Sequence, residues 1–186
     1  MQETEVKILE IDRKKIENTL VCLHAEKVFD GEIRTLFFDF EDGRIFKAKN
    51  VLRLRKEGNK AELTFKNVHF SQKAKSAEEY SVEVSDLETT RKILENLGLA
   101  LTESMEKHRV SYMIDHVRFD IDRYFGKYGY IPEFMEIETD KVGLIYKYAE
   151  LLGFKKQDCL PWSTIDLIRH YTGSENKTAN QGNQVS

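Results

Sequence analysis

The strongest constraint on the fold of this chain is a strict alternation of apolar and charged side chains. In residues 51–56, two leucines alternate with Arg53 and Arg55, and residues 60–66 repeat the alternation after a turn that contains Gly58. Side chains of a β-strand point alternately to its two faces, so each segment predicts a strand with one apolar and one charged face. The turn between them predicts a hairpin.

Other segments repeat this alternation, and amphipathic helical segments separate them. The expected strands are residues 3–10, 27–40 with a bend near Gly31, 51–56, 60–66, 78–84, 104–114, 117–122 and 133–139. Four helices are expected: one that begins at Asp12, one over 87–97 that is capped by Asp86, one that begins at Asp140, and one over 163–170. Residues 41–44 predict a turn, and residues 67–77 predict a polar connection. The pattern therefore predicts an α+β chain with about eight strands, mostly antiparallel neighbours.

Charged residues occupy one face of nearly every expected strand. They are Glu3, Glu5, Lys7, Arg53, Arg55, Lys66, Glu79, Glu83, Lys107, Arg109, Asp120, Asp122, Glu136 and Glu138. An open sheet with helices on one face and water on the other is one interpretation. A closed eight-stranded antiparallel β-barrel, with these charges in its lumen and helices packed outside, is the other. We favour the barrel because like charges recur in pairs with one residue between them, which exceeds what solubility requires.

A charged lumen needs a ligand that compensates both signs, because each partly desolvated ion costs several kcal/mol unless it is paired. Arginine offers forked donors to phosphate oxygens, and lysine offers a point charge. Clustered carboxylates bind Mg²⁺ or Mn²⁺ through hard oxygen ligands. A linear triphosphate together with divalent cations fits this mixture best.

The bulk composition narrows the class of protein. The chain has 186 residues, which predicts one domain over residues 1–172 followed by a disordered polar tail, residues 173–186. A net charge of −3 argues against a nucleic-acid coat protein, so no duplex nucleic acid partner is expected. Cys22 and Cys159 fit reduced thiols. The first residues are acidic, unlike a secretory signal, and no apolar run could span a membrane, so a cytoplasmic protein is expected.

The motifs, taken in order, resemble the CYTH family, the triphosphate tunnel metalloenzymes, which includes class IV adenylyl cyclases and thiamine triphosphatases. The matching motifs are Glu3-Thr4-Glu5-Val6-Lys7, Arg53-Leu54-Arg55, Lys66, Lys107-His108-Arg109 and Glu136-Ile137-Glu138. The acid that precedes the last motif is Asp120 or Asp122, and Asp122 is preferred. The resemblance covers about residues 2–170.

The resemblance implies a role for each matched residue. Lys7, Arg53, Arg55, Lys66, Lys107 and Arg109 would bind the triphosphate. One or two Mg²⁺ or Mn²⁺ ions would be held by Glu3, Glu5, Asp120, Asp122, Glu136 and Glu138, with Glu79 and Glu83 as further ligands. Glu5, Lys7, Lys66 and Asp122 would be catalytic.

The sequence also departs from the family pattern. Ser81 interrupts the expected Glu-x-Glu-x-Glu of one strand, which weakens the assignment of Glu79 and Glu83. Phe37-Phe38-Asp39 is close to the Tyr-Phe-Asp of class IV cyclases but lacks the hydroxyl group. Ser163-Thr164-Ile165-Asp166-Leu167-Ile168 echoes their C-terminal Ser-Tyr-x-Glu-Leu-Leu pattern.

Three functions follow from the resemblance. The preferred one is a divalent-metal-dependent phosphohydrolase of inorganic tripolyphosphate, a nucleoside triphosphate or thiamine triphosphate. The alternatives are a class IV adenylyl cyclase that makes cyclic AMP from ATP, and a noncatalytic binder of triphosphate or polyphosphate. A homodimer is compatible with the family, although no residue pattern in this sequence indicates one.

Overall fold

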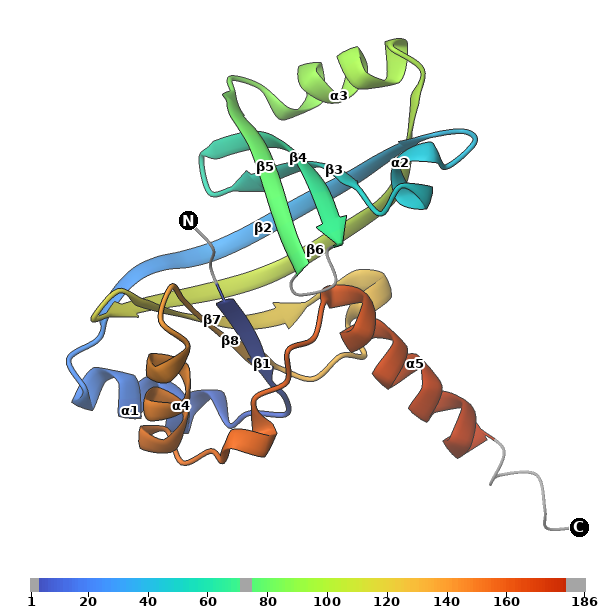
Figure 1. Ribbon diagram of the computed structural model, residues 1–186. Helices are drawn as coiled ribbons and strands as arrows, with labels where there is room; N and C mark the ends of the chain where they lie inside the picture. Colours follow the sequence, from blue (N-terminus) through green and yellow to red (C-terminus); the bar gives the residue numbers. More distant parts are fainter. Residues whose placement is uncertain (1–3, 71–74, 180–186) are drawn as a thin grey trace, which may run out of the picture. The chain divides into compact units, whose positions relative to one another are not determined.

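One antiparallel sheet organises the chain. The computed structural model describes residues 4–70 and 75–179, and within them the side chains outside 68–77 and 174–179. In this part of the chain the strands are β1 (Thr4–Ile8), β2 (Glu26–Phe40), β3 (Val51–Glu57), β4 (Lys60–Phe70), β5 (Lys75–Val84), β6 (Leu99–Ile114), β7 (Val117–Tyr124) and β8 (Phe134–Thr139) (Figure 1). They form an eight-stranded sheet in the order β1-β8-β7-β6-β2-β3-β4-β5. The expected α+β class with eight strands is confirmed.

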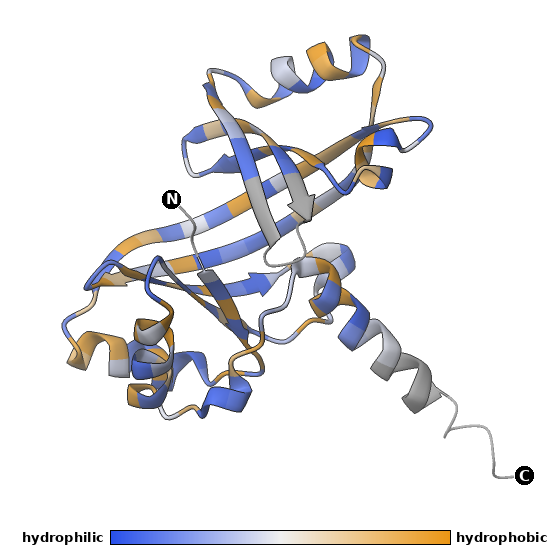
Figure 2. Cartoon of the chain, viewed as in Figure 1, coloured by the Kyte–Doolittle hydropathy of each residue, from blue (hydrophilic) through white to orange (hydrophobic). Residues whose placement is uncertain are grey.

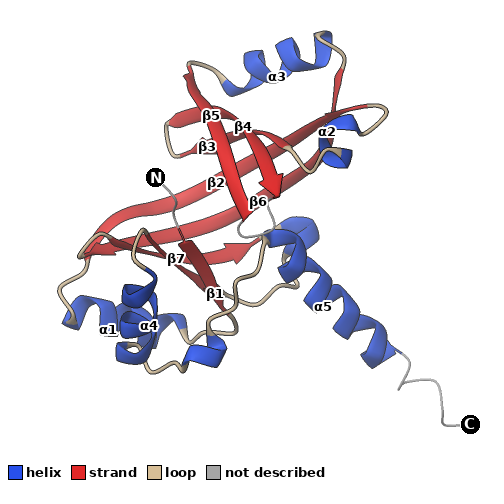
Figure 3. Ribbon diagram, in the orientation of Figure 1, coloured by secondary structure: helices blue, strands red, loops and turns tan. Residues whose placement is uncertain are grey.

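Helices separate the strands along the chain (Figure 3). They are α1 (Arg13–Cys22), α2 (Arg44–Lys47), α3 (Leu87–Asn96), α4 (Val142–Leu151) and α5 (Thr164–Ala179), with short 3₁₀ turns at Gly126–Tyr128 and Lys156–Asp158. Two predicted N-caps are confirmed: Asp12 accepts a hydrogen bond from the backbone N–H of Lys15 at 3.0 Å, and Asp86 accepts one from Thr89 at 2.7 Å. No helix among the described residues is long and apolar enough to cross a membrane.

The expected closure of the sheet into a barrel is not observed among the strands of the described residues. The strand order leaves β1 and β5 as the two edges. The outer edge of β1 is partly taken by another segment, because Lys7 and Leu160 exchange backbone hydrogen bonds of 2.8 and 2.9 Å. A backbone N–H and C=O already paired in this way cannot pair with a further strand.

Several elements run further than the sequence predicts. The hairpin of β4 and β5 continues to the pair Phe70 and Lys75, and so includes most of the predicted connection 67–77. The pairing is made by backbone N–H and C=O groups, which polar residues also supply. β6 begins at Leu99 rather than residue 104, and a short helix, α2, follows the predicted turn at 41–44. α5 reaches Ala179 instead of ending near residue 170, so it includes the first part of the predicted tail; residues 180–186 lie outside the described residues.

The chain divides into two compact units, which are treated separately below. Unit 1 is Met1–Asp30 with Arg109–Ser186, and unit 2 is Gly31–His108.

In unit 1, α1 and α4 cover the apolar face of the strands, and both helices carry hydrophobic stretches (Figure 2). Ile16, Leu20 and Ile145 are at most 1% exposed in this core. The ring of Tyr148 packs edge-on against Phe119 of β7, with centroids 5.5 Å apart. Because this face is filled with apolar side chains, residues of opposite parity on β1, β7 and β8 lie on the other face.

In unit 2, a smaller core covers the apolar side of the hairpins. Leu36, Leu54 and Ala61 of the strands belong to the same buried cluster as Leu87 and Leu94 of α3. Strand parity then places the alternating Arg53 and Arg55 on the opposite face of β3, as the sequence predicts.

Candidate functional site

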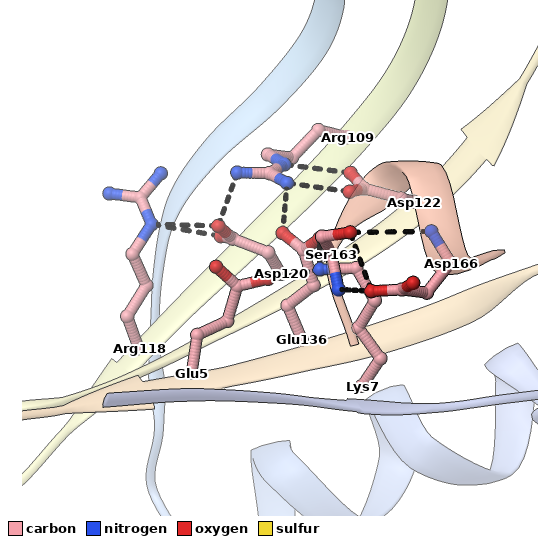
Figure 4. Close-up of polar contacts among 9 residues, drawn as sticks. All are labelled: Glu5, Lys7, Arg109, Arg118, Asp120, Asp122, Glu136, Ser163 and Asp166. Carbon is pink, nitrogen blue, oxygen red and sulfur yellow. Dashed lines mark hydrogen bonds and ion pairs between the residues drawn. The ribbon is translucent and has the colours of Figure 1, made fainter. Parts of the chain in front are cut away.

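Neighbouring strands of unit 1 place charged side chains in two cross-strand rows. The register sets Lys7 opposite Glu136 and Glu136 opposite Asp120; in the adjacent row, Glu5 faces Glu138 and Glu138 faces Arg118. Residues directly opposite each other in an antiparallel pair share a face of the sheet. These residues of β1, β7 and β8 therefore form one charged surface, joined by Arg109 and Asp122; Figure 4 shows its members other than Glu138.

Arg109 of β6 is the hub of this cluster, and its side chain is only 8% exposed. Its Nε donates to Asp122 at 2.7 Å, and its Nη2 donates to Asp122 and to Glu136 at 2.5 Å each. Its Nη1 donates to Asp120. Four of the five N–H donors of a guanidinium are thus used on three carboxylates. Burial opposes the charge of Arg109, but Asp122 above all outweighs this effect and raises its pKa well above the ordinary value.

Lys7 is the second buried cation, with 2% of the residue exposed. Its ammonium contacts Glu5 and lies 2.8 Å from Glu136. Burial lowers the pKa of Lys7, but Glu136 and Glu5 together raise it above its ordinary value, so the side chain stays charged. The pKa of Glu5 is raised, first by partial burial and then by the neighbouring carboxylate of Glu136.

Arg118 is a third cation of this surface, and the sequence-based assignment missed it. Its Nε donates to both oxygens of Asp120, at 2.9 and 3.1 Å, and its Nη2 donates to Ser111 Oγ at 3.0 Å. A signal was present in the sequence, because Arg118 has the same strand parity as Asp120 and Asp122.

The start of α5 lies near the charged surface of unit 1. The Tyr124 hydroxyl is hydrogen-bonded to Thr164, and its pKa is raised by burial and by the charges of Asp122 and Glu136. Asp166 caps this helix start by accepting hydrogen bonds from the backbone N–H and the hydroxyl of Ser163, at 2.9 and 2.6 Å (Figure 4).

Unit 2 carries the other expected phosphate-binding residues, on β3, β4 and β6. Lys66 donates to Glu79 at 2.6 Å in a pair whose side chains are 30% and 43% exposed. Lys107 lies on β6 and is 8% exposed. Glu83 is set directly opposite Glu62, an acid that the sequence-based assignment did not include.

Arg55 differs from the cations of unit 1. The register places it opposite Thr35 on one side and Glu62 on the other. Its Nε is buried and has no hydrogen-bond partner among the described residues. A buried donor without a partner carries a desolvation cost, which a phosphate oxygen would relieve.

Ser81, which interrupts the acidic family pattern, forms part of a hydroxyl chain in unit 2. Its Oγ lies 3.0 Å from the Oγ1 of the fully buried Thr64, which in turn donates to Glu62 at 2.8 Å. The position therefore supports neighbouring polar groups rather than supplying a carboxylate.

Asp39, noted for its similarity to a cyclase motif, has a structural role in unit 2. Its carboxylate accepts backbone hydrogen bonds from Phe40 at 2.7 Å and from Ile45 and Phe46 at 2.9 Å. Burial opposes its charge, but these three N–H groups lower its pKa below the ordinary value. It holds the turn that leads into α2.

The carboxylates of unit 1 have the chemistry of a divalent-cation site but are paired within the protein. Hard oxygen donors suit Mg²⁺ and Mn²⁺. Within residues 4–70 and 75–179, however, no group of three or more His, Cys, Asp or Glu side chains is arranged to hold a metal ion. Arg109 and Lys7 occupy the oxygens instead. Glu3, an expected ligand, lies outside the described residues.

The comparisons with known proteins agree with the fold and the motifs. The family model of the CYTH domain matches residues 1–142, so the chain belongs to the CYTH domain family. A curated relative, "Putative adenylate cyclase MJ0240" of Methanocaldococcus jannaschii, is 25% identical over 138 residues, which cover 74% of this chain and 77% of the relative.

Solved structures share the fold. The PH1012 protein of Pyrococcus horikoshii OT3 gives a TM-score of 0.71 at 24% identity, covering 89% of this chain and 99% of that one. HpAC1 of Hippeastrum, an adenylyl cyclase by name that is described as having a dominant triphosphatase activity, gives a TM-score of 0.66 at 15% identity, covering 92% and 96%.

Proposed function

We propose that this chain is a divalent-metal-dependent phosphohydrolase that acts on a triphosphate-containing substrate. The carrying observation is the charged surface of unit 1, where four carboxylates and the cations Lys7 and Arg109 gather in one hydrogen-bonded cluster. Such a concentration of buried charge lowers the stability of the fold, and a purely structural role would not require it. Membership of the CYTH family supports the same chemistry.

In this proposal the carboxylates of unit 1 hold one or two ions. Glu5, Glu136 and Glu138 are the main ligands because they share one face of the paired strands β1 and β8. A divalent ion supplies Lewis acidity toward phosphate oxygens and water. Asp122 is an indirect contributor, because its two oxygens hold the Arg109 guanidinium in a bidentate pair.

The basic residues bind and orient the substrate. Lys7 stays protonated, and Arg109 keeps one N–H outside its four carboxylate contacts. Arg53, Arg55, Lys66 and Lys107 are assigned to phosphate oxygens in unit 2, and the buried, unpartnered Nε of Arg55 supports this for one of them. Fixed positive charge of this kind stabilises the charge that develops on the transferred phosphoryl group.

A class IV adenylyl cyclase is the second candidate, favoured by the name of the curated relative. The first candidate is preferred because the Hippeastrum protein, which shares the fold, is described by its triphosphatase activity. The two reactions differ in their products, since a cyclase releases pyrophosphate and cyclic AMP.

The test is a product assay with tripolyphosphate, ATP and thiamine triphosphate, each with Mg²⁺ and with Mn²⁺. Phosphate release that stops on chelation supports the phosphohydrolase, and cyclic AMP with pyrophosphate supports the cyclase. Tight triphosphate binding without either product would leave a noncatalytic binder.

A matched pair of variants links the activity to the site. Arg55→Gln is expected to lower kcat/KM about 100-fold, the loss typical of a transition-state donor. Lys56→Gln changes the same charge at an exposed position of opposite parity on β3 and is expected to retain activity. Equal rates for the two variants would contradict the assignment of Arg55.

A further inference from the structure

The geometry points to Arg118 as a positioning residue that reserves Asp120 for Arg109 and keeps Asp120 out of metal binding. The inference rests on the proposed function, because it concerns the roles of the acidic residues in that same site. It also assigns different tasks to Asp120 and Asp122, which the sequence pattern leaves interchangeable.

Arg118 is held at two points of its guanidinium. Its Nε lies 2.9 and 3.1 Å from the two oxygens of Asp120, while its Nη2 donates to the hydroxyl of Ser111 at 3.0 Å. Ser111 is fully buried on β6, so this end of the contact is fixed by the fold. The side chain of Arg118 is therefore oriented before any ligand binds.

Asp120 is fully engaged as a result. It is 2% exposed, and its Oδ1 accepts from Arg118 while its Oδ2 accepts from both Arg118 and Arg109. A carboxylate enclosed by two guanidinium groups is a poor ligand for a divalent cation, because the positive charges repel the ion and three hydrogen bonds already occupy most of the lone pairs. The side chain of Glu5, by contrast, is 44% exposed.

Loss of Arg118 is expected to change the affinities for cations and for anions in opposite directions. The strand surface of unit 1 carries the carboxylates of Glu5, Asp120, Asp122, Glu136 and Glu138 and the cations Lys7, Arg109 and Arg118. Removing one of these three cations makes the surface more negative and exposes Asp120 Oδ1. A divalent ion then binds more tightly, while a triphosphate binds more weakly. General structural damage would weaken both.

The experiment compares Arg118→Gln with Arg123→Gln in the full chain. Arg123 is the exposed neighbour of opposite parity on β7, so its replacement removes the same charge from the other face. Mn²⁺ binding is measured by electron paramagnetic resonance, and tripolyphosphate binding by calorimetry. For Arg118→Gln we expect Mn²⁺ affinity to rise about threefold to tenfold and tripolyphosphate affinity to fall by a similar factor. Arg123→Gln is expected to resemble the wild type.

A second readout addresses the position of Arg109 without any ligand. The Nε–H signal of Arg109, identified by NMR through its absence in Arg109→Lys, reports the bond to Asp122. Its exchange with water is expected to be at least about tenfold faster in Arg118→Gln, with partial protection in Arg118→Lys, because Asp120 no longer holds Nη1 in place.

The outcomes separate the two proposals. Absence of tripolyphosphate binding and turnover in the wild type overturns the proposed function, and the exchange of the Arg109 signal still tests Arg118. Unchanged exchange in Arg118→Gln overturns the inference about Arg118. So does a parallel loss of Mn²⁺ and tripolyphosphate affinity in a variant that remains folded.

Discussion

The charged faces of unit 1 and unit 2 use similar residues but compensate their charges differently. In unit 1, Arg109 and Lys7 are buried and paired with carboxylates of their own unit. In unit 2, the Lys66 pair is partly exposed, and a buried nitrogen of Arg55 has no hydrogen-bond partner among the described residues. The comparison shows that the buried cations of unit 1 are paired within the protein, whereas unit 2 leaves one buried donor nitrogen without a hydrogen-bond partner among the described residues.

The largest effect is expected from breaking the internal pairing of unit 1. Arg109→Met removes the bidentate partner of the fully buried Asp122 and one cationic partner each of Asp120 and Glu136, and should lower the free energy of unfolding by about 3–5 kcal/mol. Urea unfolding monitored by circular dichroism measures the change. Arg123→Met, at an exposed position of β7, is the control and should change it by less than about 0.5 kcal/mol. A loss of under about 1 kcal/mol for Arg109→Met, the value of an exposed pair, would refute the internal pairing.

Asp39, near the end of β2 in unit 2, is a carboxylate that accepts three backbone hydrogen bonds. Asp39→Asn replaces one acceptor oxygen with an amide that opposes the N–H of Phe46, and should cost about 2 kcal/mol at pH 7. The folded pKa of Asp39 lies below the ordinary 3.8, so its contribution is present above pH 3.8 and disappears as the pH falls through the folded value. Denaturant titrations from pH 7 to 2 should show the two proteins converging in acid. A constant difference would mean that charge is not the cause.

The strand alternation was enough to predict which side chains share a face, because parity is a local property of the backbone. The register of β1, β8 and β7 sets Lys7, Glu136 and Asp120 in one row, as the alternation implies. Closure of the sheet was not predictable in the same way, because it depends on what pairs with the edges. A bridge from Lys7 to Leu160, far along the chain, has no signature in the strand pattern.

The hydrogen-bond networks could also not be predicted from the sequence. Arg118 has the parity of Asp120, yet a strand arginine is ordinarily a solvated charge, and only its side-chain direction shows the contact. The same limit applies to Ser81, whose hydroxyl partner Thr64 lies on the neighbouring strand. Parity identifies the face, whereas the choice of partner depends on register and rotamer together.

A smaller stability effect is expected at the partly exposed lysine of unit 2. Lys66→Met removes a pair with Glu79 whose side chains remain substantially solvated, and should cost between 0 and about 1 kcal/mol in urea unfolding. Lys7→Met is the matched change in unit 1 and should cost several times more, because it removes a buried cation that contacts both Glu5 and Glu136. Equal losses at the two lysines would remove the distinction between the units.

The smallest effect on stability, together with a large effect on binding, is expected at Arg55. Its Nε has no partner among the described residues, so Arg55→Met removes a desolvation cost and should leave the free energy of unfolding unchanged or raise it by up to about 1 kcal/mol. The same change removes a forked donor from the proposed phosphate face, and tripolyphosphate affinity measured by calorimetry should fall at least about tenfold. Lys56→Met, at an exposed position of opposite parity on β3, provides the control for both measurements. If Arg55→Met destabilises the protein while binding is retained, then Arg55 serves the fold of unit 2, and its demand for an anion is met within the protein.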